Sequence, residues 1–140
     1  MAPSHKVFWD EEKLNNRDTL GVLFGDRKET VKVAKLLIAK MKETSTLSIT
    51  RRQMRAFAVE LTTGELGVKY SYHNFYTNLL RKLLNMGLVE RDAMIWDPQK
   101  RKTVRVYRLL IQPITEKPPY SGFVKHMWQI AKGWNNLVQR

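Results

Sequence analysis

The chain has 140 residues, of which 43% are apolar, so it is long enough to form one domain with its own core. It contains no cysteine, which excludes disulfide bonds, thiolate zinc sites and a cysteine nucleophile. No apolar run approaches the roughly 20 residues of a membrane span, and residues 1–12 lack the layout of a signal peptide. We therefore expect a cytoplasmic protein with no membrane partner.

The net charge of +12 is unevenly distributed along the chain. Residues 1–26 contain three basic and five acidic residues, whereas residues 27–140 contain 22 basic and 8 acidic residues, a net charge of +14. A field of this sign attracts polyanions, chiefly nucleic acids or an anionic membrane face. A basic surface with no specific partner would have the same composition.

The first 43 residues are expected to form an arm and a helix. Residues 1–25 contain two apolar clusters, at 7–9 and 19–25, which favours an arm that docks on the rest of the chain over a disordered tail. A helix is expected over residues 26–43, because apolar residues recur there at helical spacing and Asp26 can cap it.

A short strand at residues 46–49 and a second helix are expected next. Thr50 and Gln53 have the spacing of a capping box, so the helix should begin after Thr50. Its first turn is basic, and helix N-termini favour anions, so phosphates would supply the missing negative charge. A solvated basic turn is an equally open interpretation. The candidate residues for contacts to a nucleic-acid backbone are Arg51, Arg52 and Arg55.

The helix expected over residues 71–86 has two chemically distinct faces. Its leucines and aromatic residues recur at steps of three and four and share one face, while the other face contains no acidic residue. Ser71 can cap the first turn, and Gly87 can end the helix in a left-handed conformation. The candidate contact residues are Ser71, His73, Asn74, Thr77, Asn78, Arg81 and Lys82.

A basic hairpin should follow this helix. Its strands are expected at residues 88–96 and 103–111, and the connection between them combines an Asp-Pro turn signal with three consecutive cations. The candidate contact residues of the hairpin are Lys100, Arg101, Lys102 and Arg105.

The C-terminal part contains a linker and an amphipathic helix. Residues 113–120 contain three of the five prolines and are expected to form a stiff linker, and residues 121–140 a helix with an aromatic stripe. The stripe either folds back on its own domain or pairs with a second copy, and its seam-like spacing favours pairing. The candidate dimerisation residues are Phe123, Met127, Trp128, Ile130, Trp134 and Leu137.

Residue patterns typical of catalysis are not found in the sequence. The three histidines are isolated, no glycine-rich loop precedes a helix, and no pair of carboxylates suggests acid–base chemistry. We expect no enzyme activity, no metal and no cofactor. No small-molecule ligand can be inferred.

Residues 66–91 resemble the helix-turn-helix core of winged-helix regulators of the MarR type and their relatives. Residues 66–68 are similar to the turn before the family's recognition helix, and Leu80, Leu83 and Gly87-Leu88-Val89 match its Leu-x-x-Leu-x-x-x-Gly-Leu-Val ending. The longer connection over residues 61–71 departs from the family pattern, so no subfamily is assigned. The resemblance implies an α+β, mostly α, winged helix-turn-helix fold over residues 26–112, with a hairpin wing and an additional C-terminal helix.

The expected function is binding of double-stranded DNA by a homodimeric, sequence-selective transcriptional regulator, associated with the nucleoid if the source is prokaryotic. The helix at residues 71–86 would enter the major groove and the basic wing would contact the backbone. Asparagine can read adenine and arginine can read guanine, although Arg81 suits a phosphate equally well. The alternatives are an architectural DNA binder with little sequence preference and a winged helix that binds another protein.

Overall fold

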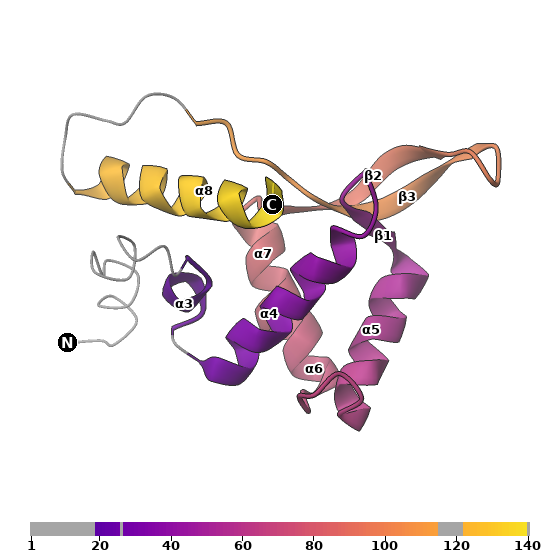
Figure 1. Cartoon of the computed structure of the whole chain (residues 1–140), viewed down its shortest axis with the longest axis horizontal. Helices are drawn as coiled ribbons and strands as arrows, with labels where there is room; N and C mark the ends of the chain where they lie inside the picture. Colours follow the sequence, from indigo (N-terminus) through magenta and orange to yellow (C-terminus); the bar gives the residue numbers. More distant parts are fainter. Residues whose placement is uncertain (1–18, 26, 115–121, 140) are drawn as a thin grey trace. The chain divides into compact units, whose positions relative to one another are not determined.

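The computed structural model describes residues 19–25, 27–114 and 122–139 and contains helices with one small antiparallel sheet (Figure 1). It divides into two compact units: a central unit of residues 32–110, and a terminal unit formed by residues 1–31 with residues 111–140. The elements are α3 (Thr19–Phe24), α4 (Lys28–Met41), β1 (Ser48–Thr50), α5 (Arg51–Thr63), α6 (Tyr72–Asn74), the π-helical segment η1 (Phe75–Leu80), α7 (Arg81–Asn85), β2 (Val89–Asp97), β3 (Lys102–Leu109) and α8 (Phe123–Gln139).

The α+β class and the positions of the main elements agree with the sequence analysis. The first expected helix is α4, two residues shorter at each end than residues 26–43, and the expected strand at 46–49 is β1 at Ser48–Thr50. The expected N-cap at Asp26, the apolar cluster at residues 7–9 and most of the proline-rich linker lie outside the described residues.

Helix α5 begins at the predicted capping box. The Thr50 hydroxyl accepts a hydrogen bond from the Gln53 backbone N–H at 3.1 Å, and the Gln53 side-chain oxygen accepts one from the Thr50 N–H at 2.8 Å. Each side chain therefore satisfies a backbone donor that the first helical turn leaves unpaired. The predicted box is confirmed.

The helix expected at residues 71–86 is formed by α6, η1 and α7 in succession. The Ser71 hydroxyl accepts a hydrogen bond from the Asn74 N–H at 3.0 Å, which confirms the predicted N-cap. At the other end, Gly87 has a φ of +74° and its N–H donates to the carbonyl of Leu84 at 3.1 Å. Glycine adopts this left-handed conformation without a steric penalty, so the chain can leave the helix here and enter β2.

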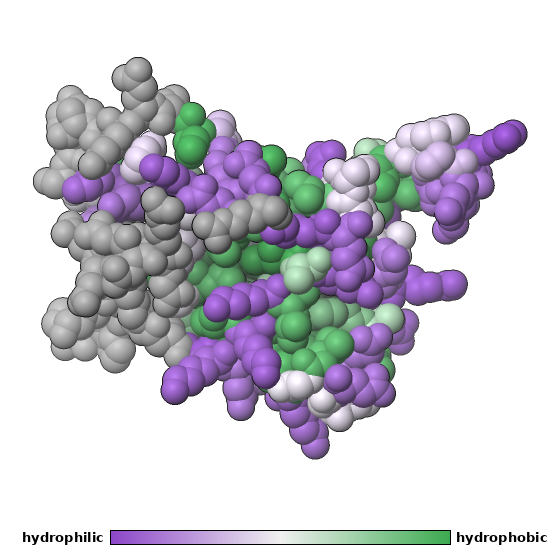
Figure 2. Space-filling view, in the orientation of Figure 1, coloured by the Kyte–Doolittle hydropathy of each residue, from purple (hydrophilic) through white to green (hydrophobic). Residues whose placement is uncertain are grey.

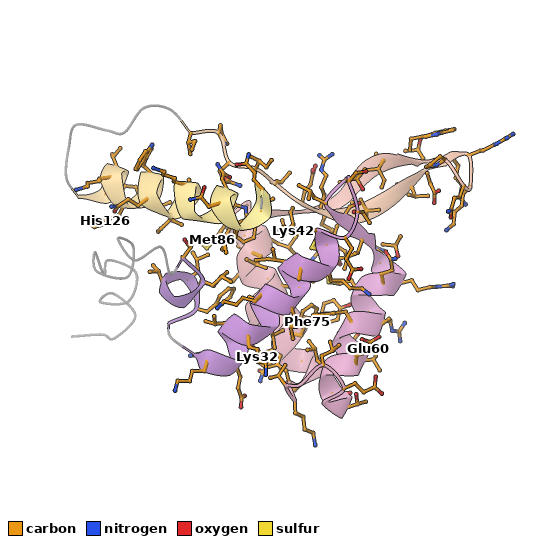
Figure 3. All side chains as sticks on the ribbon, viewed as in Figure 1. Lys32, Lys42, Glu60, Phe75, Met86 and His126 are labelled. Atoms are coloured by element: carbon orange, nitrogen blue, oxygen red, sulfur yellow. The ribbon has the colours of Figure 1, made fainter. Side chains whose placement is uncertain are left out.

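The π-helical segment within this helix was not predicted. It begins at Phe75, which is fully buried and packs against Phe57 of α5 with ring centroids 5.5 Å apart. The next residue, Tyr76, lies edge-on to Phe75 at 5.2 Å. Figure 3 shows Phe75 in the interior of the central unit, so this aromatic packing anchors the helix on α5.

The sheet has the strand order β1-β3-β2, and both pairings are antiparallel. Between Glu90 and Ala93 the register shifts, because two residues of β2 lie opposite the single residue Tyr107 of β3. One of these two residues, Asp92, has a φ of +59°. Such a bulge bends its strand and increases the local twist. Beyond the bulge the hairpin of β2 and β3 extends past the helices of the central unit (Figure 1).

In the terminal unit, α3 and α8 are in contact. A Cβ atom added to Gly133 would lie 1.9 Å from Oγ1 of Thr19, so the two helices cross at a point where only glycine fits. Farther along the unit, the Asn135 side chain accepts a hydrogen bond from the Gln112 N–H at 2.7 Å and donates one to the Gln112 carbonyl at 2.8 Å. Residues from both ends of the chain thus build one unit, whereas the sequence predicted an N-terminal arm and a C-terminal helix as separate elements.

Candidate nucleic-acid interface

The polar face of the helix formed by α6, η1 and α7 is available to solvent. Ser71, His73, Asn74, Asn78, Arg81 and Lys82 are exposed, and Thr77 is half-buried. The Asn78 side-chain amide donates a hydrogen bond to the Asn74 side-chain oxygen at 2.9 Å, as the spacing of four residues allows. The two amides are therefore held in fixed relation on the exposed face. The face combines amides and cations without a carboxylate.

An open groove of about 760 Å³ lies between the C-terminal half of this helix and the start of β2. Its polar lining includes Arg81 and Asn85 of α7 and Arg91 of β2. The one acidic lining residue, Glu90, forms an ion pair with Arg108 at 2.7 Å on the neighbouring strand. The charge of the groove is therefore dominated by its two guanidinium groups.

Arg91 is a candidate contact residue that the sequence analysis missed. It was assigned only to a strand, but the turn at Gly87 brings the start of β2 back beside α7 and places Arg91 in the same groove as Arg81. The sequence feature that could have identified Arg91 is its short distance along the chain from Gly87, where the helix ends.

The three arginines at the start of α5 are all exposed, but their surroundings differ. Nη2 of Arg51 lies 3.2 Å from Oδ1 of Asp92 in the bulge of β2. An ion pair of this kind at a solvated surface is weak, yet it offsets the charge that Arg51 would present to a phosphate. Arg52 and Arg55 remain the better candidates for backbone contacts.

A cluster of tyrosines lies beside Arg55. The rings of Tyr72 and Tyr76 are 4.8 Å apart. Burial, with smaller contributions from the Tyr72 and Tyr107 hydroxyls, raises the pKa of Tyr76 to about 12, and the positive charge of Arg55 opposes the shift. Tyr76 is therefore neutral at physiological pH, and its hydroxyl can donate a hydrogen bond.

The hairpin presents its predicted cations at its free end. Lys100, Arg101, Lys102 and Arg105 are all exposed, and hydrophilic side chains gather at the end of the hairpin in Figure 2. The carboxylate of Asp97 accepts hydrogen bonds from the backbone N–H groups of Gln99 at 2.9 Å and Lys100 at 3.2 Å. Asp97 therefore organises the turn, which ends with Arg101 at a φ of +52°.

Two large apolar side chains on the same hairpin were missed by the sequence analysis. Met94 and Trp96 are 56% and 61% exposed. They lie two residues apart on β2 and therefore point to the same face of the hairpin. Their partners in the register are Arg105 and Thr103. The alternation of side chains along a strand predicts that the two residues share a face. It does not predict that they are exposed, because this depends on the helices ending before this part of the sheet.

The candidate dimerisation residues of α8 differ in their exposure. Ile130 and Trp134 are 3% and 0% exposed within a single chain, and Met127, Trp128 and Leu137 are half-buried. Only Phe123 is well exposed, at 62%. A dimer seam that included Ile130 and Trp134 would require α8 to leave its present packing.

Comparisons of the chain with models of known protein families, with curated proteins and with solved structures find no significant match. In the described ranges, no group of three or more His, Asp or Glu side chains is arranged to hold a metal ion. No helix in this part of the chain combines the length and apolar character needed to cross a membrane.

Proposed function

We propose that the central unit is a winged helix-turn-helix module that binds double-stranded DNA, and that the protein is a homodimeric, sequence-selective regulator of transcription. The order of elements supports this proposal. Helix α4, strand β1, helix α5, the helix at residues 72–85 and the β2–β3 hairpin follow one another as in a winged helix, with β3 as the central strand. In this arrangement the helix at residues 72–85 is the recognition helix and the hairpin is the wing.

The observation that carries the proposal is the chemistry of the recognition helix. Its exposed face holds the Asn74–Asn78 amide pair and Arg81 and has no acidic residue. Amides can form paired hydrogen bonds with adenine, and a guanidinium can do so with guanine, in a major groove that is wide enough to admit a helix. Phosphates, in turn, are suited to the cations of the wing and to Arg52 and Arg55.

A homodimer is part of the proposal, with a seam narrower than the aromatic stripe of α8. Phe123 and Val124, in the first turn of α8, are 62% and 53% exposed and offer an apolar patch. Phe123→Asp should convert a dimer into a monomer in sedimentation experiments, because a carboxylate in an apolar seam is destabilising. Gln139→Asp, at the exposed end of the same helix, adds the same charge and should leave the dimer intact.

A second candidate is an architectural protein that binds DNA with little sequence preference. The exposed Met94 and Trp96 on the wing favour this candidate, because proteins that deform DNA insert apolar side chains between base steps.

Selection of binding sites from random duplex DNA by the full chain, at near-physiological salt, tests the proposal. A sequence-selective dimer should enrich inverted half-sites separated by about 10–10.5 base pairs or a multiple of this distance. Tight binding without an enriched motif would favour the architectural candidate. Absence of binding would contradict both and would favour a winged helix that binds another protein.

A further inference from the structure

The free end of the wing combines exposed apolar and cationic side chains on one small hairpin. Trp96 lies opposite Thr103, one residue pair from the turn, and Met94 lies opposite Arg105. Both apolar side chains are more than half exposed. A tryptophan and a methionine side by side on a projecting hairpin form a surface that water solvates poorly.

The charges around this surface indicate what kind of partner covers it. Residues 94–105 contain four cations and one carboxylate, and the carboxylate of Asp97 accepts two backbone hydrogen bonds within the turn. The partner should therefore be anionic and should also present a flat apolar surface. Nucleic acids combine phosphates with the faces of their bases, and aromatic side chains stack on those faces.

The size of the indole ring favours DNA in which the stack of bases is interrupted. In continuous B-DNA each base face is covered by its neighbours, and the minor groove is only about 6 Å wide. Insertion of Trp96 between intact base pairs would first require unstacking, which is unfavourable. At a gap, nick or fork, a base face is already exposed, so stacking needs no prior distortion.

We infer that Trp96 and Met94 form a base-stacking face on the wing, and that the protein binds duplex DNA with an exposed base face more tightly than continuous duplex. This inference rests on the proposed function. Arg105, on the same face of the hairpin as Trp96, holds the backbone beside the interruption while the indole ring of Trp96 covers the exposed base. The wing thereby recognises the interruption in the stack of bases, and the recognition helix contacts the intact duplex beside the interruption.

Two duplexes of identical sequence, one continuous and one with a single-nucleotide gap bordered by 2-aminopurine, provide the test. The full chain should bind the gapped duplex at least about fivefold more tightly and should change the 2-aminopurine fluorescence.

Trp96→Phe retains an aromatic ring and should keep the preference for the gapped duplex. Trp96→Ala should lose the preference and bind the gapped duplex no more tightly than the continuous one. Lys102→Gln removes a positive charge from the wing and should weaken binding to both duplexes alike. Because Trp96 and Lys102 are exposed, circular dichroism should show all variants folded.

Three results would overturn the inference. Equal affinity of the wild-type protein for the two duplexes would contradict the base-stacking role of Trp96 and Met94 but would not contradict the proposed function. If Trp96→Ala retained the preference for the gapped duplex, the preference would arise from the greater flexibility of gapped DNA and not from Trp96. Absence of binding to either duplex would remove the proposed function as well, and binding to anionic vesicles instead would identify the surface as a lipid contact.

Discussion

The guanidinium group of Arg51, the first residue of α5, lies 3.2 Å from the carboxylate of Asp92 in the bulge of β2. The contact joins the start of a helix to the base of the wing across 41 positions of sequence. In the proposed complex it also withholds one positive charge from the DNA backbone. Removing the carboxylate should therefore strengthen binding.

Asp92→Asn is predicted to increase affinity for all duplex sequences. Asparagine tolerates the φ of +59° at this position, so the bulge should persist while Arg51 becomes available for a phosphate. The slope of log affinity against log salt concentration should become steeper by about 0.9, the value for one additional neutralised phosphate. Fluorescence anisotropy at several salt concentrations measures this slope.

Two variants control for net charge. Glu43→Gln removes a negative charge from the exposed turn after α4 and should leave the slope unchanged. Lys102→Gln removes a wing cation and should make the slope shallower by about 0.9. If Glu43→Gln and Asp92→Asn had the same effect, general charge rather than the Arg51 contact would be responsible.

Asn78→Ala is predicted to weaken binding to the selected site by roughly 1–3 kcal/mol and binding to random duplex DNA much less, because amide contacts to base edges depend on sequence. Asn74→Ala should have a smaller effect of the same kind, since it removes the hydrogen bond that orients Asn78. Titrations with both DNAs measure the difference. Equal losses on the two DNAs would mean that Asn78 contacts the backbone.

Tyr76 provides a prediction of pH dependence. Its pKa is raised from the ordinary value of 10.0 to about 12, so between these values the folded protein binds this proton more tightly than the unfolded chain does. The resulting stabilisation is fully present below pH 10 and is lost as the pH rises toward 12. Denaturant unfolding from pH 9 to pH 12 should show this loss, and it should be smaller in Tyr76→Phe.

Absorbance of tyrosinate provides the matching spectroscopic measurement. Tyr76→Phe should remove the component that titrates near pH 12. Tyr72→Phe should lower the pKa of Tyr76 but keep it above 10.0, because burial is the largest cause of the shift and Tyr72 a smaller one. A return of this pKa to 10.0 in Tyr72→Phe would assign the shift to the pair instead of to burial.

Gly133→Ala tests the crossing of α3 and α8. In an open helix this substitution stabilises by about 0.5–1 kcal/mol, because alanine loses less conformational entropy. Here the new Cβ meets Oγ1 of Thr19, so a destabilisation of about 1–3 kcal/mol is predicted. Combining it with Thr19→Ala should recover part of the loss. Unfolding by denaturant measures both, and a stabilising Gly133→Ala would contradict the close crossing.

The features that the sequence predicted correctly are set by neighbouring residues. The capping box of Thr50 and Gln53, the N-cap at Ser71 and the left-handed Gly87 each depend on chemistry within a few positions. Such contacts follow from residue type and spacing alone.

The features that could not be predicted from the sequence depend on partners far away along the chain. The bulge opposite Tyr107 and the Arg51–Asp92 pair follow from the register between strands, which periodicity does not specify. The exposure of Trp96 depends on where the helices end. For Trp134, the helical stripe predicted burial but could not identify what covers it, and the side chain is buried within one chain.

The central claim is that the recognition helix and the wing face DNA together, and amide chemical shifts of the labelled full chain test it most directly. On titration with the selected duplex, the largest changes should fall at residues 72–85 and 97–105, with smaller changes at residues 51–55. In Lys102→Gln the same pattern should appear at a higher duplex concentration. Changes confined to α8, or absent from residues 72–85, would contradict the account.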